Sequence, residues 1–347
     1  MIKPVSNPPN PWESTYVEWI GEPSEAKLEV FEEEPRSILA ENESPDVGFR
    51  WSLNPYRGCF HACSYCFART SHEYLGFGAG TDFDRKIVVK INAPQLLRRE
   101  ISRRSWKGEV IIFSGNTDCY QPLEAVYELT RRCLEVCAEF RNPVAIITKG
   151  ALVRRDVDLL ARMARETSVS VSLSVPFSDD AMSRAIEPNA SLPSQRFETL
   201  RLLSEAGIGT GVAIAPLIPG LNDGQICAIL ERARACGARS AFLSLVRLAG
   251  QTLPVFRERL EQAFPDRAPK VWNAIRQTRG GKLNESEFGL RMHGVGPRWE
   301  AIRSLFDLEC RRLGFNQERT GENEGEKSYQ RPGQQGALFE LEPGLPL

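Results

Sequence analysis

Three cysteines stand within one short stretch of the chain, with three residues between Cys59 and Cys63 and two between Cys63 and Cys66. Thiolates are soft ligands that select iron–sulfur clusters and zinc. A [4Fe–4S] cluster normally takes four cysteine ligands, so three ligands leave one iron open to a substrate or cofactor. The spacing therefore predicts a [4Fe–4S] cluster with one open iron, held by Cys59, Cys63 and Cys66.

Zinc is the alternative metal, because His61 lies between the cysteines and would complete a Cys3His set. Such a site would be cramped, since alternate residues of one loop would have to converge tetrahedrally. No second Cys or His pair follows about 12 to 20 residues on, as zinc modules usually show. The cluster is the favoured interpretation. The rival, from a different functional class, is a zinc-stabilised nucleic-acid-binding module without turnover.

The elements that must position this loop alternate between strand and helix. Six short apolar runs have the pattern of strands: 49–53, 110–114, 144–148, 169–175, 211–217 and 241–246. Five segments between them have the pattern of helices: 94–104, 123–140, 152–166, 193–206 and 222–236. Repeated alternation of this kind predicts an α/β fold with a parallel sheet and right-handed crossovers. Six units fall short of the eight of a closed TIM barrel, so we expect a partial (β/α)6 barrel.

Polar residues follow several of the expected strands. Thr117 and Asp118 follow the second strand, Lys149 the third, and Ser174 ends the fourth. Reactive groups of parallel α/β barrels gather at these carboxyl ends. A lysine at the end of a buried strand is costly without an anionic partner. We therefore expect these side chains to lie at one site, with an anionic group beside Lys149.

The cysteine spacing, with Tyr65 before the third cysteine, resembles the radical S-adenosylmethionine (SAM) superfamily. Residues 54–59 (NPYRGC), 117–122 (TDCYQP), 148–149 (TK) and 187–188 (EP) are similar to the branch that contains spore photoproduct lyase. This resemblance covers about residues 49–250. Residues 71–77 and 279–282 are similar to a bacterial subgroup often labelled the PA0069-type radical SAM family, whose reaction is unassigned.

The resemblance implies a partial TIM barrel, a [4Fe–4S] cluster and SAM as cofactors. It implies that Tyr65 lies against the adenine, Thr117 meets the amino group, Lys149 the carboxylate and Ser174 the ribose of SAM. It also implies cleavage of SAM to a 5′-deoxyadenosyl radical that abstracts hydrogen from an unknown substrate. The expected partners are an electron donor such as flavodoxin or ferredoxin and, by analogy with the lyase, a nucleic-acid substrate.

The chain departs from spore photoproduct lyase after the second strand. In that enzyme a hydrogen-donating cysteine precedes a Ser-Asp pair, and here Gly115 takes the aligned place before Thr117 and Asp118. Cys119 lies on the other side of the pair, with Tyr120 beside it. We predict that Cys119 returns a hydrogen atom and that Tyr120 relays a radical. The alternative is that Cys119 is a packed small residue.

Length and composition fit an enzyme with a sizeable core. The 347 residues are 41% hydrophobic and carry a net charge of −1, which excludes a global basic field for nucleic acid. No apolar run approaches the length of a membrane span, and no secretory signal is visible, so we expect a cytoplasmic protein. The expected organisation is an N-terminal extension, partly disordered (1–48), a radical SAM core (49–250), a helical C-terminal region (251–313) and a disordered tail (314–347).

Other polar residues have both a functional and a structural interpretation. The group at 72–74 (HEY) either orders the cysteine loop or touches substrate, and ordering is the favoured role. His293 is a contact or a lone histidine without function, and the second is favoured. The basic run at 98–107, with Trp106, binds a nucleic-acid backbone or is a solvated helix face, and the solvated face is favoured.

Overall fold

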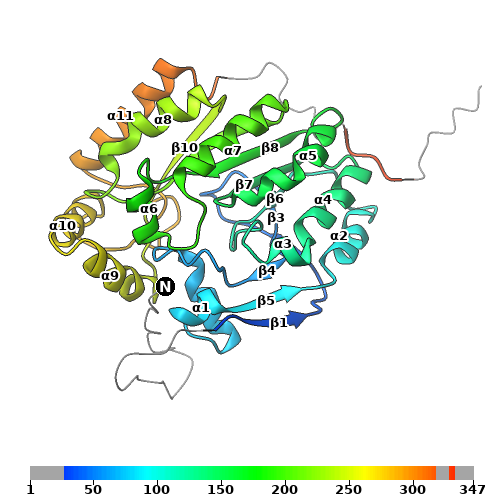
Figure 1. Cartoon of the computed structure of the whole chain (residues 1–347), viewed down its shortest axis with the longest axis horizontal. Helices are drawn as coiled ribbons and strands as arrows, with labels where there is room; N and C mark the ends of the chain where they lie inside the picture. Colours follow the sequence, from blue (N-terminus) through cyan, green and yellow to red (C-terminus); the bar gives the residue numbers. More distant parts are fainter. Residues whose placement is uncertain (1–26, 318–327, 333–347) are drawn as a thin grey trace, which may run out of the picture.

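The computed structural model describes residues 27–317 and 328–332 (Figure 1). Its main sheet has seven strands in the order β10-β9-β8-β7-β6-β3-β2. Six neighbouring strands are parallel: β3 (Trp51–Leu53), β6 (Ile111–Phe113), β7 (Val144–Thr148), β8 (Val169–Ser174), β9 (Gly209–Leu217) and β10 (Ser240–Leu245). These are the six strands expected from the sequence, so the partial (β/α)6 fold is confirmed. In the described part of the chain β2 and β10 form the two edges of this sheet.

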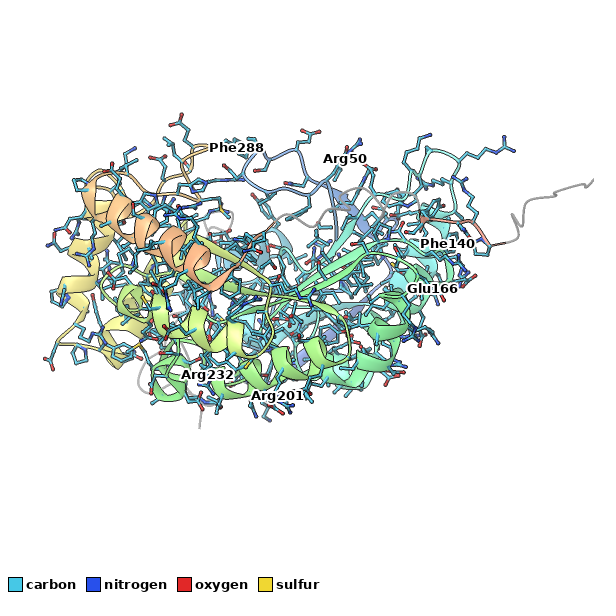
Figure 2. All side chains as sticks on the ribbon, turned by 90° about the horizontal axis from the view of Figure 1, so that it is seen from above. Arg50, Phe140, Glu166, Arg201, Arg232 and Phe288 are labelled. Atoms are coloured by element: carbon cyan, nitrogen blue, oxygen red, sulfur yellow. The ribbon has the colours of Figure 1, made fainter. Side chains whose placement is uncertain are left out.

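Helices connect the parallel strands and cover one side of the sheet (Figure 1). They are α2 (Ala93–Ile101), α4 (Leu129–Glu139), α5 (Val157–Met163), α7 (Pro193–Glu205) and α8 (Ile226–Ala235). Short turns precede three of them: α3 (Glu124–Tyr127), η2 (Ala151–Asp156) and η3 (Asp223–Gln225). The apolar faces of these helices and of the strands share one core. Seen from above, Arg201 of α7 and Arg232 of α8 lie on the helix side, and Arg50 and Phe288 lie on the opposite side (Figure 2).

The helix expected over 123–140 is in two pieces. Glu128 has a left-handed backbone (φ 53°) that separates α3 from α4. Glu124 is fully buried, and its carboxylate accepts hydrogen bonds from Thr130 N (2.9 Å) and Arg155 Nη2 (2.7 Å). Arg155 is 31 residues from Glu124, so helical periodicity within 123–140 could not reveal this contact. Three further helices were not expected: η1 (Phe67–Leu75), α1 (Thr81–Arg85) and α6 (Asp180–Ile186). The Asp179 side chain caps α6 by accepting from Met182 N at 2.7 Å.

The N-terminal extension contributes strands to two sheets. Residues Glu29–Glu33 form β1, which pairs with β5 (Lys86–Lys90) in a small sheet completed by β4 (Tyr56–Arg57). Residues Leu39–Glu41 form β2, antiparallel to β3. The loose character expected for this region therefore does not hold from residue 29 onward. Residues 1–26 lie outside the described part of the chain.

The C-terminal region contains α9 (Thr252–Ala263), α10 (Ala268–Thr278) and α11 (Pro297–Leu313). Buried side chains of α11 join the main core, whereas α9 and α10 pack with Cys63 and Tyr65 of the cysteine loop. Part of the tail that was expected to be disordered contacts α2, since Tyr329 Oη donates to Ile101 O at 2.5 Å. Residues 318–327 and 333–347 of that tail lie outside the described residues.

No helix among the described residues combines the length and the apolar character that crossing a bilayer requires.

Candidate active site

A pocket of about 740 Å³ opens at the carboxyl ends of the parallel strands. The cysteine loop forms one wall, and residues after β6, β7, β8, β9 and β10 form others. Segments from outside the barrel core also reach it, at 46–49 and 291–293. A volume of this size holds a cofactor together with a substrate. The pocket lies where the strand-end residues were expected to meet.

The three cysteines of the loop all line this pocket. The exposed fractions of Cys59 and Cys63 are 8% and 7%, and Cys66 is partly buried. None of the three forms a disulfide. Burial raises the pKa of each thiol, so each holds its proton until a positive metal centre replaces it. Three soft sulfurs that line one pocket have the ligand chemistry of the expected [4Fe–4S] cluster, although no three Cys, His, Asp or Glu side chains among the described residues are assembled to hold a single metal ion.

Gly58 lets the chain turn into the cysteine loop. Its φ is +74°, and a Cβ there would lie 2.9 Å from Phe83 O and 3.0 Å from His72 Cε1. The next residue, Cys59, donates its N–H to the same Phe83 carbonyl at 3.0 Å. Only glycine combines this backbone conformation with so close an approach.

Arg69 is a buried residue that stabilises the cysteine loop, and it was not predicted from the sequence. Its side chain is fully buried, and its Nε and Nη2 donate to Cys63 O at 3.0 and 2.9 Å. Its Nη1 donates to the carbonyls of Ala79 and Gly80, and Nη2 also pairs with Asp84 Oδ1 at 2.8 Å. Burial raises the pKa of Asp84 to about 6, although Arg69 opposes this. A single arginine shortly after the cysteines forms no sequence pattern that would indicate this role.

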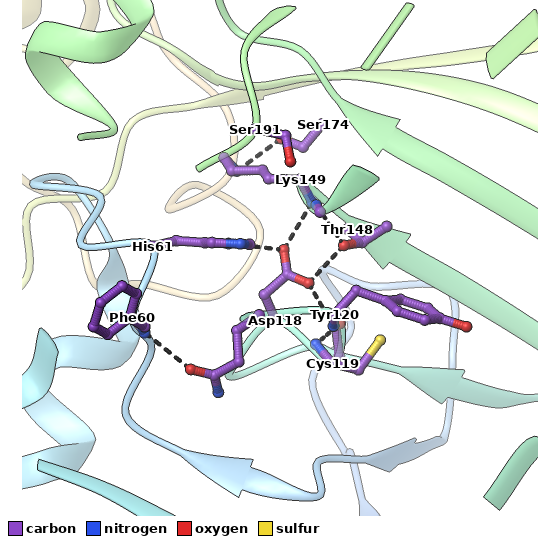
Figure 3. Close-up of polar contacts among 12 residues, drawn as sticks. Phe60, His61, Asp118, Cys119, Tyr120, Thr148, Lys149, Ser174 and Ser191 are labelled. Atoms are coloured by element: carbon purple, nitrogen blue, oxygen red, sulfur yellow. Dashed lines mark hydrogen bonds and ion pairs between the residues drawn. The ribbon is translucent and has the colours of Figure 1, made fainter. Parts of the chain in front are cut away.

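Residues after α6 hold the other side of the loop. Asn189 Nδ2 donates to Phe60 O at 2.8 Å, and Asn189 N donates to His61 O at 3.1 Å. Gln121 Oε1 accepts from Phe60 N at 2.9 Å (Figure 3). The backbone of the loop is therefore fixed before any metal binds.

Asp118 is the centre of a polar network beside the loop (Figure 3). Its Oδ1 accepts from Thr148 Oγ1 (2.6 Å) and Tyr120 N (2.9 Å). Its Oδ2 accepts from Lys149 N (2.7 Å) and lies 3.3 Å from His61 Nδ1. Burial opposes ionisation, but His61 and these donors hold the pKa of Asp118 well below its usual value. Asp118 thus joins the loop to strand β7, a role that the sequence analysis did not assign.

Lys149, Ser174 and Tyr65 lie together in the pocket, as the sequence analysis expected. Lys149 Nζ donates to Ser174 Oγ at 2.8 Å and lies 5.6 Å from the centre of the Tyr65 ring. Burial lowers the pKa of Lys149. Glu187 Oε1 lies 3.9 Å from Nζ, which is too far for a hydrogen bond. The ammonium therefore has room for a stronger anionic partner.

A buried ion pair between Glu187 and Arg196 contacts Tyr65 and Ser174. Glu187 and Arg196 are fully buried with Arg196 Nη2 2.5 Å from Glu187 Oε2. The Tyr65 hydroxyl donates to Glu187, and Arg196 Nη1 donates to Ser174 O at 2.7 Å. The pair thus positions Tyr65 and Ser174. Glu187 was noticed only through the family resemblance, and Arg196 gave no signal because it lies in an ordinary helical pattern.

Thr117 also lines the pocket. Its hydroxyl donates to Tyr56 O at 2.7 Å, which leaves the oxygen lone pairs as acceptors. An acceptor suits an ammonium group, and contact with the amino group of SAM stays a prediction.

Cys119 and Tyr120, the two candidates for catalytic roles, do not line the pocket. Cys119 is fully buried in the main core and does not line the pocket. Tyr120 is 1% exposed, and its hydroxyl donates to Asp156 Oδ2 at 2.9 Å on the side of Asp118 away from His61 (Figure 3). The strand-end loop turns at Asp118, so that Asp118 faces the pocket and the next two side chains face the core. The structural alternative for Cys119, a packed small residue, fits this placement.

The remaining candidates take the structural roles that were favoured, with one exception. His72 is buried, with Nε2 2.9 Å from Lys86 O, and burial lowers its pKa to about 4. Trp106 is buried and donates to Asn142 Oδ1 at 2.8 Å, so it offers no stacking face to nucleic acid. His293 is the exception, because it lies at the pocket.

Comparison with known proteins now identifies the family. A model described as the radical SAM superfamily matches residues 53–233, more than half of the chain. The chain belongs to the radical SAM superfamily. A [4Fe–4S] cluster and SAM are the cofactors that this family implies, and the pocket fits them. Family membership therefore favours the cluster over the zinc alternative.

The proteins similar to this chain include several that are named as uncharacterized. An uncharacterized protein of Mycobacterium tuberculosis is 39% identical over 220 residues, which are 63% of this chain and 65% of that protein. The match thus spans less than two thirds of that relative's length. A protein of Pseudomonas phage M6 named radical SAM Nalpha-GlyT isomerase is 23% identical over 274 residues, 77% of this chain and 55% of that protein.

Solved structures of spore photoproduct lyase share the fold. The complex with dinucleoside spore photoproduct superposes with a TM-score of 0.61 at 14% identity, over 86% of each chain. At this identity the likeness establishes the fold alone.

Proposed function

We propose that this radical SAM enzyme holds a [4Fe–4S] cluster on Cys59, Cys63 and Cys66 and binds SAM between the loop and the ends of β7 and β8. The observation that carries the proposal is a single pocket that three thiols, Lys149 and Ser174 line together. When bound, a reduced cluster and SAM supply a 5′-deoxyadenosyl radical that abstracts hydrogen from a substrate.

The chain's own residues bind and orient the cofactor in this proposal. Lys149 pairs with the SAM carboxylate, because among the described residues its partly buried ammonium has only a neutral hydroxyl within 3 Å. Ser174 meets the ribose, Thr117 accepts from the amino group, and the Tyr65 ring lies against the adenine. Asp118 positions Lys149 through its backbone N–H, and Glu187 positions Tyr65 through its hydroxyl.

The finer proposal is a lyase-like reaction on a nucleic-acid substrate, with flavodoxin or ferredoxin as electron donor. Its support is indirect. A lyase of the same fold is described with a dinucleoside spore photoproduct and, in one form, with bound AdoMet. Two residues of the basic run at 98–107 add nothing to it, because Arg98 pairs with Glu139 and Trp106 is buried.

Anaerobic reconstitution with iron and sulfide tests the proposal. The protein should turn brown, bind close to four irons per chain and form 5′-deoxyadenosine from SAM under a strong reductant. Cys63→Ser should lose most iron and sulfide, because it removes one thiolate from one iron. Cys227→Ser is the matched control, since Cys227 is a partly buried cysteine outside the pocket, and it should keep a full complement. A Cys63→Ser protein with an unchanged cluster spectrum would refute the ligand assignment.

The substrate class is tested by the same assay with DNA, RNA and peptide pools added. A nucleic acid should raise 5′-deoxyadenosine formation above the slow rate without substrate. Stimulation by peptides alone would replace the nucleic-acid proposal and leave the cofactor assignment intact.

A further inference from the structure

Arg247 lies in the pocket at the sheet edge that is remote from the cysteine-loop strand. It follows β10, whereas Lys149 follows β7, so three strand positions separate the two cations. Neighbouring strands lie about 4.8 Å apart, which places Arg247 on the order of 14 Å from Lys149 along the sheet. Both side chains line the same pocket. The pocket therefore has a second cationic group beyond the proposed SAM contacts.

The guanidinium of Arg247 has no oxygen partner in the described chain. Its Nε is buried without a hydrogen bond, and its Nη1 has only the thioether sulfur of Met292 at 3.8 Å. Its Cζ lies 5.2 Å from the centre of the Phe67 ring, which follows Cys66. Contacts to a ring and a thioether orient a guanidinium but leave its strong donors unused.

Asp46, the carboxylate whose charge acts on Arg247, is already bonded to other donors. Asp46 Oδ1 accepts from Gly289 N and Oδ2 from Arg291 Nε, both at 2.5 Å. Burial lowers the pKa of Arg247, the charge of Arg291 lowers it further, and Asp46 opposes both. An arginine stays charged in proteins, so this partly buried cation lacks its counter-ion.

The pocket that Arg247 shares also has apolar lining residues from residues 47–49 and from β10: Val47, Phe49, Phe242 and Leu243. Such a wall suits a flat or aliphatic body, and a planar guanidinium suits a phosphate or carboxylate in two-point contact.

We propose that the substrate of this enzyme carries an anionic oxygen group, a phosphate or a carboxylate, that pairs with Arg247 while its apolar body lies on the wall of Val47, Phe49, Phe242 and Leu243. The inference rests on the proposed function, because the proposed function assigns Lys149 and the three thiols to the cofactors and leaves Arg247 for the substrate. It makes Arg247 a substrate-binding residue.

Paired probes test this assignment on the reconstituted protein with SAM bound. Calorimetry compares uridine 5′-monophosphate with uridine, and N-acetylphenylalanine with its amide. The wild-type protein should bind the charged member of at least one pair about tenfold to a hundredfold more tightly. The pair that shows this preference distinguishes a phosphate from a carboxylate.

Three variants decide whether Arg247 is responsible. Arg247→Gln should abolish the preference, and Arg247→Lys should restore part of it. Arg311→Gln removes one exposed arginine of α11 and should keep the preference. A wild-type protein without preference for either charged probe would overturn the inference, whereas a normal cluster and 5′-deoxyadenosine formation in that protein would leave the proposed function standing. Loss of SAM affinity in Arg247→Gln would also overturn it, by placing this arginine at the cofactor.

Discussion

At the scale of residues, burial separates the groups that face the pocket from those that only stand near it in the sequence. Asp118, Cys119 and Tyr120 are consecutive, yet only Asp118 lines the pocket. Lys149 is 16% exposed and has an incomplete set of partners, whereas the Tyr120 hydroxyl is bonded inside the core. Incomplete partners in a pocket indicate a binding role, and complete partners in a core indicate packing.

Replacement of Lys149 should weaken SAM binding. Lys149→Met removes a charge-assisted contact to the carboxylate, so we expect affinity to fall about tenfold to a hundredfold with the cluster retained. Anaerobic calorimetry measures the affinity, and iron analysis measures the cluster. Lys107→Met, at an exposed lysine outside the pocket, is the control. Unchanged affinity in Lys149→Met would mean that this ammonium does not contact SAM.

Replacement of Cys119 should act on stability alone. Cys119→Ala removes one buried sulfur from the core, and we expect a loss of about 1 to 2 kcal/mol in the free energy of unfolding. SAM affinity and 5′-deoxyadenosine formation should match the wild type, because the side chain does not reach the pocket. Denaturant unfolding and product analysis check both statements. An altered product with normal SAM cleavage would restore the hydrogen-return role.

At the scale of elements, the cysteine loop depends on contacts from the turn that follows it and from three distant segments. Arg69 and Asp84 hold it from the following turn, Asn189 from the segment after α6, and Gln121 from the loop after β6. Thr252 of α9 adds a bond to Cys66 O at 3.2 Å. Because these contacts hold the backbone of the loop in place, its thiols do not have to become ordered when a cluster binds. Mutations of the residues that hold the loop should therefore lower cluster binding.

The turn at Gly58 offers a direct test of that dependence. Gly58→Ala imposes a left-handed alanine and a Cβ 2.9 Å from Phe83 O, so we expect a loss of about 2 to 4 kcal/mol and a lower iron content. Gly207→Ala is the matched control, because Gly207 has a similar φ of +79° and no atom within 4 Å of the added Cβ. It should cost about 1 kcal/mol and keep the cluster. Equal iron content in both variants would contradict a tight turn as a requirement of the loop.

At the scale of the whole molecule, segments far apart in the sequence close one side of the pocket. The stretch 46–49 and the stretch 291–293 both line it, and the ion pair Asp46–Arg291 joins them at 2.5 Å. Arg279 holds the second stretch by donating to Leu290 O, Arg291 O and His293 O. The region at 279–294, whose role the sequence did not reveal, thus belongs to the pocket wall.

The Asp46–Arg291 pair should be energetically coupled. The exposed fraction of the Asp46 side chain is 1%, so a double-mutant cycle with Asp46→Asn and Arg291→Gln should give a measurable coupling free energy. The exposed pair Arg201–Glu205 on α7 is the comparison and should give a smaller coupling. Denaturant unfolding of the four proteins of each cycle measures these values. Coupling near zero for Asp46–Arg291 would mean that the two stretches are joined by other contacts.

The sequence by itself determined the partial barrel and the cysteine loop, because both depend on local regularities. Apolar runs at strand spacing predicted six strands to within a few residues, and the three cysteines lie in one short loop whose spacing is readable directly. The rule that parallel strands present their carboxyl ends at one edge also placed Lys149 and Ser174 together, where their side chains are 2.8 Å apart.

Only the tertiary structure decided which way the strand-end side chains turn and what supports them. Cys119 faces the core because the loop turns at Asp118, and no periodicity reports such a turn. The buried pairs Arg69–Asp84 and Glu187–Arg196 join residues 15 and 9 positions apart, and β1 gains its partner β5 from more than fifty residues away. Arg247 became a candidate only when its unpartnered Nε was found in the pocket. These features depend on long-range pairing, for which the local sequence carries no signal.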